Sequence, residues 1–240
     1  MMDLQQLYSY TRRAIDDYKM IEDNDKIAIG ISGGKDSLTL AYALSGLRRF
    51  YPKKFDIVAI TVDLGIGIQV TEDITKMCEN LDIEHHIVKT QIGEVLFDVR
   101  NEKNPCSLCA TMRKGALNNL ADELNCNKIA YAHHKDDIIE TMLMSLIYEG
   151  RFYCFSPKLH LDRKKLDVIR PMMYINEGDI KNFAKRYKLP IAKNPCPADG
   201  HTKRQYVKEL ARHLESENPG VRERLFHAII SGNISGWPII

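Results

Sequence analysis

The sequence lacks several features that would fix its class at once. No apolar run approaches the roughly 20 residues that a membrane-spanning helix needs, and the charged, amphipathic N-terminus has no apolar signal-peptide core. We therefore expect a cytoplasmic protein that does not enter a membrane. The formal net charge is only +2, so any nucleic-acid binding must use a local basic patch. Internal repeats and low-complexity segments are also absent.

Cysteines are few, and their spacing leaves a metal site incomplete. Six cysteines in 240 residues, without an export signal, indicate thiols in a reducing compartment. Cys106 and Cys109 have the spacing of a metal-binding pair, but the second Cys-x-x-Cys that would complete a zinc site is absent. Cys196 lies in a proline-rich loop between Pro195 and Pro197. The thiols that we expect to be buried are Cys78, Cys126 and Cys154.

Short apolar runs alternate with helical patterns over most of the chain. Strands are predicted at 26–31, 56–63, 84–90, 128–132 and 167–172. Helices are predicted at 4–20, 37–49, 71–82, 109–125, 136–149, 176–188, 203–216 and 219–231. This alternation predicts an α/β fold, a parallel sheet with helices on both faces. We expect an N-terminal helix (1–24), an α/β domain (25–190), and a loop with a C-terminal helical extension (191–240).

A glycine-containing loop follows the first predicted strand. Its sequence is Ser32, Gly33, Gly34, Lys35, Asp36 and Ser37. Glycines let the backbone approach a ligand, and a helix N-terminus with a nearby lysine suits phosphate. The loop is neither a Walker loop, because Ile29 and Asp36 occupy two fixed positions, nor the Gly-x-Gly-x-x-Gly dinucleotide fingerprint. The alternative is an ordinary tight turn.

Histidines and carboxylates gather after the fourth predicted strand, at His133, His134, Asp136, Asp137 and Glu140. In a parallel sheet, ligands bind at the carboxyl ends of the strands. A carboxylate pair there can hold Mg²⁺ against ATP phosphates or transfer a proton. The alternative is that Asp136 or Asp137 only caps the following helix, and one imidazole can be a packed side chain.

The loop "SGGKDS" resembles the pyrophosphate loop of the N-type ATP pyrophosphatases. These enzymes split ATP to AMP and pyrophosphate while they activate a carbonyl oxygen, and they share an adenine-nucleotide α-hydrolase fold. Asp63 matches the family position that contacts adenosine, and "AHHKDDIIET" (132–141) resembles the RNA-modifying members. The resemblance implies a nucleotide site formed by Ser32, Gly33, Gly34, Lys35, Asp36, Ser37, Asp63, His133 and Arg170.

Nearly the whole chain is similar to the tRNA 2-thiocytidine synthetase family and its tRNA thiolation relatives. The motifs that carry the similarity are "SGGKDS", "PCSLCATMRKGAL", "KIAYAHHKDDIIET", "FSPKLH", "VIRPM", "PC" at 195–196 and "RQ" at 204–205. Family members hold a [4Fe–4S] cluster on three cysteines, which match Cys106, Cys109 and Cys196. The resemblance thus implies that the protein supplies three cysteine ligands and no fourth because one iron stays free to bind sulfur. The rival is zinc, with His201 completing a Cys₃His tetrahedron.

The chain also departs from the family pattern. The flanking zinc fingers of the 2-thiouridine enzymes are absent. Asp199 or its neighbours stand where the 2-thiocytidine branch often has a further cysteine, which leaves the substrate base open. Ala132 replaces a common glycine before the two histidines.

The resemblance implies an ATP- and Mg²⁺-dependent tRNA sulfurtransferase, with cytidine as the expected base. AMP transfer would activate a pyrimidine oxygen, and sulfur from sulfide or a cysteine desulfurase persulfide would displace AMP. Lys35 would neutralise pyrophosphate, and Arg113 or Lys114 would stabilise the transition state. Asp136 and Asp137 complete the expected catalytic set. We expect a homodimer that binds tRNA.

Three basic stretches are candidates for RNA contact. They are Lys158 with Arg163, Lys164 and Lys165; Lys203 with Arg204 and Lys208; and Arg212 with Arg222 and Arg224. The aromatic residues that can stack on bases are Tyr153, Phe155 and Tyr206. The alternative is that these charges form solvated helix faces.

Two other functions are compatible with the loop. An ATP pyrophosphatase acting on a small molecule would leave the three cysteines unexplained. A non-catalytic redox sensor or RNA-binding module would hold a cluster but would not cleave ATP.

Overall fold

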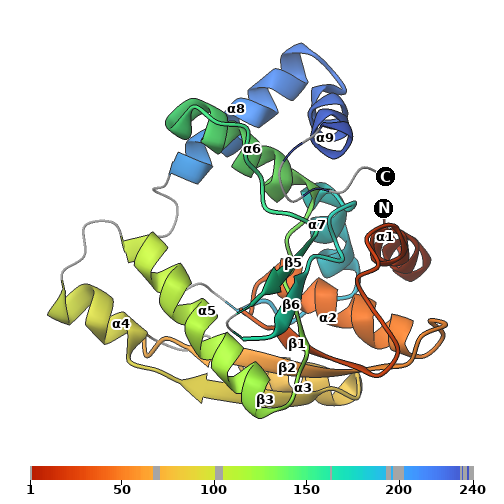
Figure 1. Ribbon diagram of the computed structural model, residues 1–240, viewed down its shortest axis with the longest axis vertical. Helices are drawn as coiled ribbons and strands as arrows, with labels where there is room; N and C mark the ends of the chain where they lie inside the picture. Colours follow the sequence, from red (N-terminus) through yellow and green to blue (C-terminus); the bar gives the residue numbers. More distant parts are fainter. Residues whose placement is uncertain are drawn as a thin grey trace.

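A six-stranded sheet forms the centre of the protein (Figure 1). The computed structural model describes residues 2–66, 71–100, 105–162, 164–192, 196, 203–232, 234 and 237. The strands are β1 (Asp25–Gly30), β2 (Phe55–Asp63), β3 (Glu84–Lys89), β4 (Lys128–Ala130), β5 (Lys158–Leu161) and β6 (Leu166–Ile169). Their order is β3-β2-β1-β4-β6-β5. All neighbours pair in parallel except β5, which runs antiparallel to β6.

Helices cover both faces of the sheet. The helical segments are α1 (Leu4–Asp17), α2 (Lys35–Arg48), α3 (Glu72–Asn80), α4 (Ile92–Glu94), the π-helix η1 (Val95–Val99), α5 (Pro105–Glu123), α6 (Lys135–Glu149), α7 (Glu177–Arg186), α8 (Lys203–Glu217) and α9 (Val221–Ser231). Within β1, alternate side chains serve the two faces, as strand geometry requires. Ile27 and Ile29 join the core that contains α2, whereas Ala28 packs with Leu117 of α5.

The C-terminal helices lie beside α6 at one end of the molecule (Figure 1). The α6 helix starts directly after β4 and its turn, so its first residues lie at the carboxyl edge of the sheet. The loop that joins β1 to α2 ends at this same edge, because β1 and β4 are parallel neighbours. The topology thus brings the two motifs of the sequence together.

The predicted α/β fold is confirmed, and most predicted elements lie within a few residues of those observed. Asn125 ends the α5 region in the left-handed conformation, with φ 55°. Two segments were missed, β5 and the α4–η1 pair. Both are short: β5 has four residues, of which Leu159 and His160 are exposed, so it has no apolar run to signal it. The expected buried thiols Cys78, Cys126 and Cys154 are buried.

The chain's three-part division stays a prediction. In the described ranges, no helix combines the length and the apolar character that crossing a membrane requires.

Candidate nucleotide and thiol site

A cavity of about 360 Å³ opens at the carboxyl edge of the sheet. Three segments supply its polar wall. The β1–α2 loop contributes Ser32, Asp36 and Ser37; α5 contributes Arg113 and Lys114; and the segment after β4 contributes His133 and Asp137. Apolar side chains of β2 and α5 complete the wall. The cavity therefore combines a phosphate-type loop with two cations from a different helix.

The β1–α2 loop leaves a helix N-terminus open to a ligand. Gly33 has φ 77°, a left-handed conformation that favours glycine, and Gly34 is the N-cap of α2 without a side-chain cap. The Ser37 hydroxyl donates to the Gly34 carbonyl at 3.0 Å and accepts from the Ser32 N–H at 3.1 Å. These bonds hold the turn while the first N–H groups of α2 stay available for an anion.

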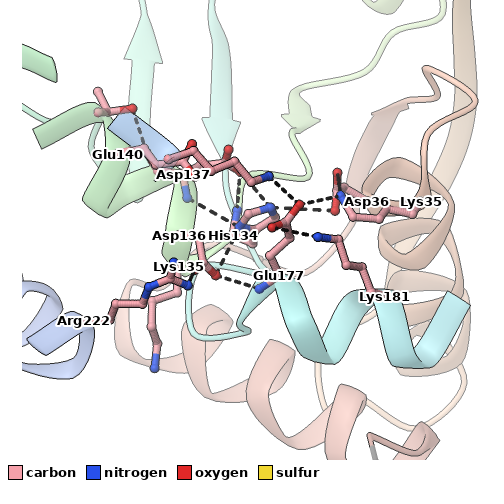
Figure 2. A network of polar contacts seen from close by, with 12 residues as sticks. Lys35, Asp36, His134, Lys135, Asp136, Asp137, Glu140, Glu177, Lys181 and Arg222 are labelled. Carbon is pink, nitrogen blue, oxygen red and sulfur yellow. Dashed lines mark hydrogen bonds and ion pairs between the residues drawn. The ribbon is translucent and has the colours of Figure 1, made fainter. Parts of the chain in front are cut away.

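Lys35 is held by two carboxylates (Figure 2). Its ammonium lies 2.9 Å from Asp36 and 3.3 Å from Glu177. Burial acts to lower the pKa of Lys35, but the two carboxylates outweigh it and raise the pKa above its ordinary value. Lys35 is therefore a fully charged group at the edge of the phosphate loop.

Glu177 is a site residue that the sequence did not reveal. Besides Lys35, its carboxylate accepts from Lys208 of α8 at 2.7 Å and lies 3.1 Å from Lys181. Burial acts to raise the pKa of Glu177, but these lysines lower it to about 2. The only local signal was an acidic residue in a first helical turn, which is common.

His134, and neither aspartate, is the N-cap of α6. Its Nδ1 accepts from the Asp137 N–H at 3.4 Å, and the Asp137 carboxylate accepts from the His134 N–H at 3.0 Å. The alternative that Asp136 or Asp137 only caps the helix is therefore met in part: neither is the N-cap, but Asp137 is the third residue of a capping box. A histidine ring nitrogen occupies the capping position that an Asp or Ser oxygen usually fills.

Asp136 and Asp137 occupy different environments. Asp136 is buried, and its two oxygens accept from Arg222 of α9 and from the Glu177 N–H, both at 2.6 Å. Asp137 lines the cavity and lies 3.6 Å from Arg204 of α8. The geometry gives Asp136 a role in docking α9 and leaves Asp137 as the carboxylate that faces the cavity.

His133 forms the cavity wall as a neutral imidazole. Its Nδ1 accepts from Arg170 Nε at 3.3 Å, which leaves the proton on Nε2. Burial, and then the Arg170 charge, lower the pKa of His133 to about 3. The Phe155 ring lies 4.5 Å from the His133 ring and 4.7 Å from the Arg170 guanidinium.

This packing bears on two predicted roles, base stacking by Phe155 and nucleotide binding by Arg170. Phe155 is half-buried against His133 and Arg170, so it supports the wall and does not present a free face for a base. Arg170 is buried behind His133, and its guanidinium also donates to the Ser156 carbonyl. Burial lowers the pKa of Arg170 to about 10, so it stays charged.

The three candidate cluster cysteines influence one another. Cys106 is exposed, and Cys109 and Cys196 are half-buried. Burial raises the pKa of Cys109; the Arg113 charge and hydrogen bond lower it, and Cys196 and Cys106 raise it further. The grouping of Cys196 with the other two cysteines stays a prediction. Because Arg113 also lines the cavity, it connects Cys109 to the cavity wall.

The three thiols fit an iron–sulfur cluster by their chemistry, since thiolates are its usual ligands. No group of three His, Cys, Asp or Glu side chains in the described part of the chain is close enough to hold a single metal ion. His201, the possible fourth zinc ligand, lies outside the described residues, as do Arg163 and Asp199. The metal assignment stays a prediction.

Asp63 does not line the cavity. It ends β2, and its carboxylate accepts from the Gly65 N–H at 3.0 Å. Its role toward adenosine stays a prediction.

Several of the cations expected to contact RNA already have partners in the protein. Arg204 lies 3.4 Å from Glu140, Lys208 contacts Glu177, and Arg222 contacts Asp136. Lys158 lies 3.3 Å from Asp167. Lys203 and Arg212 are exposed on α8.

A family model described as a PP-loop domain matches residues 5–214 of the chain. The protein belongs to the PP-loop family. Its relatives include the tRNA-cytidine(32) 2-sulfurtransferase of Geobacter sulfurreducens, which is 36% identical over 92% of this chain and 87% of that protein. The enzyme of the same name from Saccharophagus degradans is 38% identical over 90% of this chain and 71% of that protein.

Solved structures agree with this placement among PP-loop proteins. The U34-tRNA thiolase NcsA from Methanococcus maripaludis, solved with its [4Fe–4S] cluster, matches with a TM-score of 0.76 and 27% identity. The match covers 94% of this chain and 77% of that one. An NH₃-dependent NAD synthetase from Campylobacter jejuni has the same fold, with a TM-score of 0.53 and 18% identity over 95% and 92% of the two chains. The resemblance to tRNA thiolation enzymes is confirmed, and so is the expectation of an enzyme.

Proposed function

We propose that this PP-loop protein is an ATP-dependent tRNA sulfurtransferase that replaces the 2-oxo oxygen of a cytidine with sulfur. The observation that carries the proposal is Arg113, which lines the cavity beside the phosphate loop and also hydrogen-bonds Cys109. One helix, α5, thus joins the ATP site to the thiols. The relatives named tRNA-cytidine(32) 2-sulfurtransferase support tRNA as the substrate and cytidine as the base.

In the first step, the base oxygen attacks the α-phosphorus of ATP. The bond from that phosphorus to the bridging oxygen breaks, and pyrophosphate leaves. The open N-terminus of α2 and the Lys35 ammonium stabilise the charge that builds on the leaving group. Arg113 and Lys114 line the same cavity and can neutralise the nucleotide's α-phosphate.

Magnesium fits the carboxylates of this cavity. One Asp36 oxygen, Oδ1, is buried without a hydrogen-bond partner, and Asp36 and Asp137 line the same wall. Carboxylate oxygens are the ligands that Mg²⁺ prefers, and the ion would add positive charge at the phosphates.

In the second step, sulfide adds at the activated carbon, and AMP leaves with the former carbonyl oxygen. With sulfide as the donor, no oxidant or reductant is consumed; a cysteine desulfurase persulfide would also need a two-electron reductant. Cys106, Cys109 and Cys196 would hold the [4Fe–4S] cluster, which supplies an iron with an open position for sulfur. Arg113 would orient the thiols and the activated base toward each other. The homodimer stays part of the proposal.

The test uses protein reconstituted without oxygen, a tRNA transcript, ATP, Mg²⁺ and sulfide. We expect thiocytidine by mass analysis of the digested tRNA, with AMP and pyrophosphate formed in equal amounts. ADP and phosphate as the main products would overturn the ATP step. In cells that lack the protein, tRNA that keeps its full content of 2-thiocytidine would overturn the substrate.

A further inference from the structure

Three exposed aromatic side chains lie at the end of α6 and in the loop that follows it, and a fourth lies on α8, which packs beside α6. Tyr148, Phe152, Tyr153 and Tyr206 are 42%, 77%, 43% and 56% exposed. The first three come from the end of α6 and the following loop, and Tyr206 comes from the second turn of α8. We call these four residues the aromatic platform. So much exposed ring surface indicates an interaction site.

Cations lie directly on two of the rings. The Lys203 ammonium is 4.7 Å from the centroid of the Tyr148 ring, and the Arg151 guanidinium is 4.8 Å from that of Tyr153. Lys203 also joins the platform to α8, since Tyr206 follows it by three residues on the same helical face. Arg151 is paired with Glu149 at 2.6 Å, so the charge that the surface adds to its flat apolar faces is that of Lys203.

This combination fits unpaired RNA better than a second protein chain. A protein interface that covered the platform would bury Lys203 away from water, which is costly for a lysine, and lysines are depleted in interface cores. Unpaired nucleotides offer bases that stack on aromatic rings and phosphates that accept from Lys and Arg.

The platform connects to the cavity through two helices. Arg204, next to Lys203, lies 3.6 Å from Asp137 in the cavity wall. Tyr148 is 11 positions after Asp137 on α6, or about 16 Å along the helix at 1.5 Å per residue. A nucleic acid that lay along α6 and α8 would reach both places.

We propose that the aromatic platform stacks unpaired bases of the tRNA loop that flank the nucleotide entering the cavity. This inference rests on the proposed function for the identity of the RNA. It adds a recognition mode, base stacking outside the cavity. Stacking would explain how a protein with a net charge of +2 selects the unpaired loop of a tRNA over its paired stem.

The test compares Phe152→Ala and Tyr206→Ala with Phe50→Ala, a control ring that is 54% exposed and packs against Tyr8 of α1. The probes are a tRNA anticodon stem-loop and a fully paired RNA of the same length. We expect each platform variant to bind the stem-loop about 5- to 150-fold more weakly, as loss of a base–aromatic stack implies. The control variant should bind like the parent, and duplex binding should not change.

Salt dependence separates stacking from charge. Stacking releases no counterions, so Phe152→Ala should keep the parent's slope of affinity against salt concentration. Lys203→Gln should make that slope shallower by about one ion. Circular dichroism checks that each variant is folded.

Three results would overturn the inference. Unchanged stem-loop affinity in both Phe152→Ala and Tyr206→Ala would remove the stacking role. An equal loss for duplex RNA would mean that unpaired bases are not what is recognised. A platform variant that turns a dimer into a monomer by sedimentation, with RNA affinity intact, would assign the surface to a second copy. Failure of thiolation by the parent protein would instead overturn the proposed function and leave the stacking result standing.

Discussion

At the scale of single residues, Lys35 forms ion pairs with two carboxylates, and we expect the phosphates of a bound nucleotide to replace them. Asp36 and Glu177 hold its ammonium ready at the loop without ATP. Lys35→Ala removes a charge-assisted contact worth roughly 1.5–3 kcal/mol, so kcat/KM for pyrophosphate release should fall about 10- to 150-fold. Lys181→Ala is the control, because Lys181 pairs with the same Glu177, at 3.1 Å, but lies on α7 and outside the β1–α2 turn. Equal losses in both variants would show that Lys35 acts only through Glu177.

The low pKa of His133 predicts how the free energy of unfolding depends on pH. Its pKa of about 3 in the folded protein lies below the ordinary histidine value near 6.5, so below pH 6.5 the unfolded chain binds a proton that the folded chain does not. The free energy of unfolding therefore falls as pH drops from 6.5 toward 3, by up to about 1.4 kcal/mol per pH unit from this group. The groups that face His133 and oppose its protonation are Arg170, Arg204, Lys114 and His134.

His133→Asn removes this titration, so its unfolding free energy should depend less steeply on pH than that of the parent. Denaturant unfolding between pH 4.5 and 7 measures the two slopes. His213→Asn, which changes an exposed histidine on α8, should keep the parent's slope. A parent and His133→Asn with identical slopes would mean that His133 titrates normally in the folded protein.

At the scale of elements, the start of α6 depends on the C-terminal helices. Asp136 is held by Arg222 of α9 and by the N-terminus of α7 (Figure 2). Lys135 pairs with Glu223 at 2.9 Å. Asp136→Ala leaves Arg222 without its partner and should lower the free energy of unfolding by about 3 kcal/mol. Lys76→Ala breaks an exposed pair, with Glu72, and should cost less than about 1 kcal/mol. Denaturant unfolding of both variants is the measurement.

Activity measurements test whether Asp136 has a structural role alone. If Asp136 only docks α9, Arg222→Gln should reproduce the stability loss of Asp136→Ala, and both should retain ATP cleavage at temperatures where they are folded. An Asp136→Ala protein that is as stable as the parent but inactive would return Asp136 to the catalytic set.

The elements also show what the sequence can and cannot predict. Strands such as β1 and β2 are continuous apolar runs because both of their faces are buried, and such runs are visible in the sequence. The edge strand β5 has no such run. The roles of Glu177 and Asp136 depend on contacts between distant positions: Asp136 meets Arg222 across 86 positions, and Lys35 of α2 meets Glu177 of α7. The cap at His134 is local, but histidine is not among the usual capping residues. The phosphate loop was predictable because all its features lie within six consecutive residues.

At the scale of the whole molecule, the candidate cluster cysteines and the β1–α2 loop belong to different parts of the chain. Cys106 and Cys109 start α5, which packs on one face of the sheet through Leu117 and Ala121. Cys196 precedes α8, which is tied to α6 and α7 by Arg204 and Lys208. The cavity lies where these two assemblies meet the β1–α2 loop.

The last prediction follows from this arrangement. Cys196 is 87 positions from Cys109, so its replacement tests the tertiary site and leaves the phosphate loop intact. Cys196→Ser, reconstituted without oxygen, should lose most of the broad visible absorption of a [4Fe–4S] centre and should no longer transfer sulfur. Its affinity for ATP, measured by calorimetry, should stay within about threefold of the parent's, since a change of well under 1 kcal/mol is expected for a site that does not contact the nucleotide. Cys78→Ala, which changes a buried thiol of the core, should keep the absorption and lose only stability. A Cys196→Ser protein with full absorption and full sulfur transfer would show that the three-cysteine assignment is wrong, and Cys126 or Cys154 would then be the next ligand to replace.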